Sequence, residues 1–190
     1  MEKEKILKAC IIFIILQAVL INVYNVLNRG LRIDTFVIFI FILTTLYFFG
    51  FWYTKNYEVP IMILILGSLL SLLYLAGNQL HIGSSRLYDT YILILRYDYF
   101  VHALAPFIMT FVLYAPLKKH MKLQKKDKRL FYGILMLSAL GIAVAFEINE
   151  LFQVVFFNKG PQVGDYMNNA FDLFFGVVGV ILAGMILMKR

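Results

Sequence analysis

Cysteine is almost absent from this chain of 190 residues. The single Cys10 can form no internal disulfide, and its place inside an apolar run is typical of a small buried hydrophobe. Charge is also scarce, since Asp, Glu, Lys and Arg make up only 15% of the residues, whereas 62% are hydrophobic. A soluble domain of this length could not keep so much apolar surface away from water, so this composition excludes a soluble fold.

Three further features of the sequence narrow the class of protein. The first apolar run has no small-residue cleavage site at its end, which favours a retained membrane span over a signal peptide. The cations behind the formal net charge of +7 lie in short segments between apolar runs, as topology signals do, so no nucleic-acid partner is expected. Paired, broken hydrophobic segments, which would indicate a transporter built from inverted repeats, are not found in the sequence.

Six apolar runs have roughly the length of about 20 residues that a membrane-spanning helix needs. They cover residues 6–27, 33–53, 60–76, 99–117, 130–157 and 169–188. With a cytoplasmic N-terminus, most of the 18 Lys and Arg residues fall on the cytoplasmic side, above all those in 118–129. The sequence therefore predicts an all-α, polytopic membrane helix bundle in the plasma or inner membrane. It is expected to form one integral membrane domain over 1–190, with both termini cytoplasmic and with membrane lipid as its partner.

The segment 81–98, between the third and fourth expected spans, is too polar to cross the membrane. Leu87, Tyr91, Ile94 and Leu95 recur in it at helical spacing, with polar residues between them. This pattern predicts a short amphipathic helix on the outer face of the membrane.

The last three expected spans carry polar groups near their outer ends. Asp98 and His102 are four residues apart and share one helix face. Glu147 lies about 21 Å along the fifth span at 1.5 Å per residue, in the outer half of the bilayer, and Glu150 follows one turn later. One stripe of the sixth span has polar side chains toward its outer end and small residues toward its inner end. Its members are Asp165, Asn168, Asn169, Asp172, Gly176, Gly179 and Ala183.

Five carboxylates and one imidazole at one depth would repel strongly without a cation or shared protons. Ionisable residues inside a membrane usually serve a function, and these donors suit one divalent cation such as Zn²⁺, Mn²⁺ or Mg²⁺. A sequence-local metal motif such as His-Glu-x-x-His is absent, so the site has to be assembled from separate helices. The predicted metal ligands are Asp98, His102, Glu147, Glu150, Asp165 and Asp172.

Each of these groups also has a structural interpretation. Asp98 and Asp165 could cap helices, and His102 could be a satisfied interior histidine. Asn168 and Asn169 are of a type that more often joins helices than binds ligands. In the outer segment, Arg86 and Arg96 are either solvated charges or a site for a phosphate or carboxylate headgroup, in which case Asn169 is expected to bind substrate with them.

The order of three motifs resembles the YjdF-like family of small predicted inner-membrane proteins, with a looser likeness to VanZ-like membrane proteins. The motifs are Asp-x-x-x-His, Phe-Glu-x-x-Glu and Gly-Asp followed seven residues later by Asp, and they cover the second half of the chain. Here they are Asp98/His102, Phe146/Glu147/Glu150 and Gly164/Asp165/Asp172. Family proteins tend to have a third acid where this chain has Asn168. The resemblance implies that the motifs form one unit, but it names no reaction.

These patterns favour a small intramembrane enzyme whose pocket opens to the outer leaflet. A metal would activate water against a lipid or lipid-linked headgroup, and Glu147 or His102 would move protons. Two alternatives stay open: a proton- or ion-coupled transporter that uses the same acids, and a structural or regulatory membrane protein with a satisfied polar core. No oligomeric state is predicted.

Overall fold

The computed structural model describes residues 60–121, 127–157 and 166–189, together with residues 4, 8, 12, 13, 15, 16, 19, 20, 23, 56 and 57. The chain divides into two compact units, Met1–Leu75 and Ala76–Arg190. Helix α3, Ile61–Gln79, begins in the first unit and ends in the second. It coincides with the third expected span, whereas the spans expected at 6–27 and 33–53 lie largely outside the described residues.

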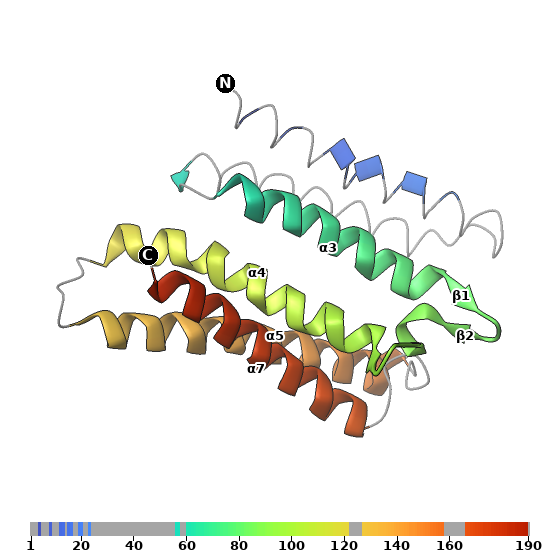
Figure 1. Ribbon diagram of the computed structural model, residues 1–190. Helices are drawn as coiled ribbons and strands as arrows, with labels where there is room; N and C mark the ends of the chain where they lie inside the picture. Colours follow the sequence, from blue (N-terminus) through green and yellow to red (C-terminus); the bar gives the residue numbers. More distant parts are fainter. Residues whose placement is uncertain are drawn as a thin grey trace. The chain divides into compact units, whose positions relative to one another are not determined.

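Three long helices form the second unit: α4 (Tyr97–His120), α5 (Lys128–Phe157) and α7 (Tyr166–Met188). All three pack against one another, α4 and α7 most extensively, and α5 runs opposite to the other two (Figure 1). Each is long and apolar enough to cross a membrane, in agreement with the last three expected spans. A helical membrane fold is therefore confirmed, while the total of six spans and the cytoplasmic termini stay predictions.

The contact between α4 and α7 depends on small residues and on a proline. A Cβ added to Gly179 would overlap the backbone carbonyl of Ala103, so only glycine allows the two helices to lie this close. Pro106 has no amide hydrogen for the carbonyl of His102, four residues earlier, and this carbonyl instead lies 3.8 Å from the position of a Cβ on Gly176. The close approach brings the His102 turn of α4 to the level of the first turns of α7.

Helix α5 contacts α4 and α7 near its own N-terminal end. The hydroxyl of Tyr132 donates a hydrogen bond to the carbonyl of Leu187 over 2.9 Å, and the ring of Phe131 meets Tyr114 edge-on. Phe131 and Leu135 are 1% and 0% exposed, so this end of the helix supplies much of the core. Apolar side chains on other faces of the helix are exposed, as expected for a surface that meets lipid: Leu137, Phe146, Val155 and Phe156.

The short amphipathic helix expected within 81–98 is not what the structure forms there. The segment makes two antiparallel β-hairpins, β1 (His81–Ile82) with β2 (Ser85–Arg86) and β3 (Tyr91–Ile92) with β4 (Leu95–Arg96), separated by the 3₁₀ turn η1 (Leu87–Asp89). Each hairpin reverses through a two-residue turn that begins with a positive φ, 64° at Gly83 and 60° at Leu93. These tight turns interrupt any helix, and the apparent helical spacing arose from apolar residues in the 3₁₀ turn, on two strands and in a hairpin turn.

Candidate metal centre

His102 lies between two carboxylates on the inner side of α4. Its Nε2 is 3.3 Å from Oδ1 of Asp98, one turn earlier, and its Nδ1 is 3.2 Å from Oε1 of Glu147 on α5. Asp98 is only 5% exposed and is not the N-cap of α4, because that position belongs to Arg96. The imidazole is therefore fixed in orientation by one acid from its own helix and one from a neighbouring helix.

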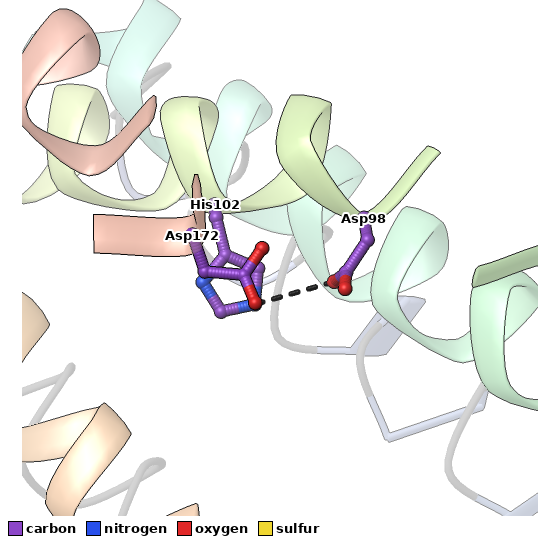
Figure 2. A group of neighbouring side chains, drawn as sticks. All are labelled: Asp98, His102 and Asp172. Carbon is purple, nitrogen blue, oxygen red and sulfur yellow. Dashed lines mark ion pairs between the residues drawn. The ribbon is translucent and has the colours of Figure 1, made fainter. Parts of the chain in front are cut away.

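Asp172 on α7 completes a compact group with Asp98 and His102. Figure 2 shows the three side chains, each of which offers one potential ligand atom, and these three atoms lie within 4.8 Å of one another. Asp172 is 2% exposed, and its Oδ1 has no hydrogen-bond partner among the described residues; Oε2 of Glu147 is likewise buried and unpartnered there. Buried carboxylate oxygens without a donor are unfavourable, so this arrangement calls for a positive charge or further donors.

Asn168 joins the acids of two helices. Its Nδ2 donates hydrogen bonds to Oδ2 of Asp172 over 2.7 Å and to Oδ2 of Asp98 over 3.2 Å, while its Oδ1 accepts one from Arg96. From the sequence, this asparagine was expected to join helices by hydrogen bonds rather than to bind a ligand. Its position one turn before Asp172, on the polar stripe of the helix, already placed it beside the predicted ligands.

A series of ion pairs and a hydrogen bond connects Asn168 with the two hairpins. Arg96, which precedes the membrane-spanning part of α4, pairs with Asp89 over 3.0 Å, and Arg86 pairs with the same carboxylate over 2.9 Å. Burial opposes the charge of the Arg96 guanidinium, but Asp98, Tyr99 and Asp89 outweigh it, so the pKa of Arg96 is raised and its charge is permanent. Sequence reasoning found both arginines but missed Asp89 as their shared partner.

The two arginines give a matched pair for mutation. Arg96→Gln removes the ion pair with Asp89, the hydrogen bond to Asn168 and the contact of the guanidinium with the Tyr99 ring, whereas Arg86→Gln removes an ion pair with Asp89. We expect a clear fall in melting temperature for Arg96→Gln, because it loses the part-buried hydrogen bond to Asn168, the residue that bonds both acids. Arg86→Gln should change stability by about 0–1 kcal/mol, as isolated surface pairs do. Thermal unfolding in detergent checks this, and equal effects of the two variants would contradict the role of Asn168 as a connector.

The remaining predicted site residues lie around this group or outside the described part of the chain. Glu150 follows Glu147 by one turn of α5 and is half-buried. Asn169 is also half-buried, and its Oδ1 has no hydrogen-bond partner among the described residues. Asp165 lies outside the described residues.

One pair of donors in this group has the spacing that a bound ion requires. Two ligands on a tetrahedral ion with bonds of about 2.0–2.1 Å lie about 3.3–3.4 Å apart. The 3.3 Å between Nε2 of His102 and Oδ1 of Asp98 matches this distance. If Nε2 bound the ion, Nδ1 would donate its hydrogen to Glu147, which is the usual arrangement of a metal-binding histidine supported by a carboxylate.

Together, the apolar helices and the buried Asp/His/Asp group define a helical integral membrane protein with a polar centre inside its bundle. The chain belongs to the family described as "Predicted membrane protein (DUF2238)", which matches residues 8–190. This match confirms the resemblance to YjdF-like membrane proteins, a family of unknown function, and the membrane location. No curated protein and no solved structure matches the chain.

Proposed function

We propose that this protein is a membrane-embedded metalloenzyme in which Asp98, His102 and Asp172 hold one divalent cation. The observation that carries the proposal is the convergence of these three donors within 4.8 Å, with one oxygen of Asp172 buried and unpartnered among the described residues. An ion would neutralise acids that otherwise face one another in a site of low dielectric.

The donor set favours Zn²⁺ or Mn²⁺ over Mg²⁺. Imidazole is a common ligand of zinc and other transition metals, whereas Mg²⁺ prefers oxygen atoms alone and retains several waters. Three protein donors also leave a coordination position open, which is typical of catalytic rather than structural zinc sites. A cation bound here would supply Lewis-acid chemistry. Glu147, which contacts the second nitrogen of His102, is proposed to hold that ring in place and to move protons.

The proposed substrate is the anionic headgroup of a lipid or lipid-linked molecule. Asp98 and His102 lie in the first two turns of a membrane-spanning helix, near the level of the headgroups. Arg96 and Arg86 follow toward the end of the bundle, where guanidinium groups can bind phosphate or carboxylate. Asn169, next to the acid cluster, is proposed to bind the same substrate.

The described part of α7 gives little support to a path through the membrane. Below Asp172, its buried positions hold only small or aliphatic side chains: Gly176, Gly179, Val180, Ala183, Gly184 and Leu187. A transporter needs polar groups that continue toward the other side of the membrane. A pocket open to one leaflet agrees better with this distribution.

An assay on defined lipid tests the proposed reaction class. The purified protein is reconstituted in vesicles of phosphatidylethanolamine and phosphatidylglycerol, supplied with Zn²⁺ or Mn²⁺, and the lipids and soluble products are followed by mass spectrometry. We expect a metal-dependent change in headgroup composition with the wild-type protein and none with Asp172→Asn, which keeps the shape of the side chain but removes its charge. A wild-type protein that binds the metal yet leaves both lipids intact would contradict headgroup chemistry on these lipids.

A further inference from the structure

The two hairpins before α4 share one geometry, displaced by ten residues. The amide of Leu87 bonds the carbonyl of Leu80 over 2.8 Å, and the amide of Tyr97 bonds the carbonyl of Thr90 over 3.0 Å. Each hairpin ends in an arginine of extended conformation, Arg86 or Arg96, after which a helical turn begins. The first hairpin is therefore a natural reference for the second.

The turns of the two hairpins differ sharply in chemistry. The first turn is polar and contains Gly83 and Ser84, whereas the matching positions of the second are Leu93 and Ile94. Leu93 is 95% exposed and Ile94 is 87% exposed. The neighbouring residues Tyr91, Ile92 and Leu95 are apolar and exposed as well, and the hairpin ends in the half-buried Arg96.

Leu93 is unfavourable at this position in two ways. Its φ of 60° lies in the left-handed region, where a side chain crowds the following carbonyl and where glycine is the usual residue, as at Gly83. A turn in water would gain from a polar residue or glycine here, and the first hairpin has such residues. A leucine is favourable here if the tip lies in an apolar environment, because burial of its side chain away from water then lowers the free energy.

We propose that the tip formed by residues 91–95 inserts into the leaflet at which α4 enters the membrane. The strand β4 ends at Arg96 and the membrane-spanning helix starts at Tyr97, so the hairpin is continuous with a segment already in the bilayer. The tip lies two to three residues beyond Arg96, which at about 3.3 Å per residue allows a reach of about 7–10 Å. Apolar groups of interfacial elements are buried to about 5–10 Å, so the tip reaches the upper acyl chains while Arg96 stays among the headgroups.

The base of the hairpin is fixed, which favours insertion of its tip as a unit. Arg96 is held by Asp89 and Asn168, and Tyr97 bonds back to Thr90. The tip therefore acts as a rigid anchor that sets the height of Asp98 relative to the lipid headgroups. This inference concerns the membrane contact alone and does not depend on the metal.

Tryptophan fluorescence with brominated lipids tests the insertion. The only native tryptophan is replaced by Trp52→Phe, and Ile94→Trp is compared with Ser84→Trp, the matching position of the polar hairpin. The full chain is reconstituted in phosphatidylcholine vesicles whose acyl chains carry bromine near the headgroup. We expect blue-shifted emission and loss of most of the fluorescence for Ile94→Trp, against water-like emission and little quenching for Ser84→Trp.

A second measurement tests directly whether the tip is exposed to water. In a Cys10→Ser background, Ile94→Cys should react far more slowly with a membrane-impermeant maleimide than Ser84→Cys. Emission of Ile94→Trp that is blue-shifted but not quenched by bromine would mean that protein, such as a second copy of the chain, covers the tip, and would overturn the proposal. Water-like emission together with fast labelling at residue 94 would overturn it as well.

Discussion

Removal of divalent metal by a chelator is expected to lower the melting temperature of the wild-type protein. Without a cation, Asp98 and Asp172 lie close together beside His102 inside the bundle, and one oxygen each of Asp172 and Glu147 is buried and unpartnered among the described residues. A ligand present at 100 times its dissociation constant stabilises the folded state by about 2.7 kcal/mol, which for a chain of this size corresponds to about 5–10 °C. Zn²⁺ or Mn²⁺ in excess of the chelator should restore the loss.

Two variants sharpen this experiment. Asp172→Asn keeps an acceptor for Asn168 but removes a ligand charge, so its melting temperature should no longer respond to chelator or to metal. Glu147→Gln leaves the three donors intact and alters only the partner of Nδ1 of His102, so the metal should still bind, about 10–100-fold more weakly. A chelator effect of equal size in wild type and Asp172→Asn would show that the ion binds elsewhere.

Replacement of Gly179 by leucine should prevent the bundle from closing. A single Cβ at this position already overlaps the carbonyl of Ala103, a backbone atom that cannot rotate away, so α4 and α7 would have to separate. Overpacking of a core by side-chain atoms alone costs about 1–3 kcal/mol, and a clash with backbone is expected to exceed this range. Because the same contact sets His102 against Asp172, the variant should lose both monodisperse behaviour in gel filtration and metal binding.

Gly141→Leu on α5 provides the matched control. This glycine is exposed, and a Cβ there would meet no atom within 4 Å, so leucine should add only lipid-facing surface. Normal gel-filtration behaviour of Gly141→Leu beside failure of Gly179→Leu would support the close packing. If Gly179→Leu were also folded and bound metal, the proposed contact between α4 and α7 would be wrong.

The last three spans could be predicted from the sequence because a bilayer imposes length and apolarity directly on each helix. Expected and observed bounds differ by no more than a few residues, as for 169–188 against Tyr166–Met188. The segment 81–98 was misinterpreted, because apolar residues spread over short strands and tight turns imitate helical spacing. The left-handed turn at Leu93 in particular has no sequence signal, since leucine is rare in such turns.

The grouping of Asp98, His102, Glu147 and Asp172 could also be predicted, because helix periodicity and membrane depth fix both the face and the height of each group. The finer geometry could not. Nothing in the sequence shows that His102 contacts Glu147 through Nδ1, or that Asn168 bonds two acids at once. Such details depend on the exact rotation of each helix, to which the close contact of Gly179 with Ala103 contributes.

The most direct test of the proposed centre is X-ray absorption at the zinc edge, measured on purified protein loaded with one equivalent of Zn²⁺. The arrangement of Asp98, His102 and Asp172 predicts a first shell of nitrogen and oxygen at about 2.0–2.1 Å, with the multiple scattering of one imidazole that disappears in His102→Gln. Sulfur in the first shell, or an imidazole signal that persists in His102→Gln, would contradict this assignment of the metal site.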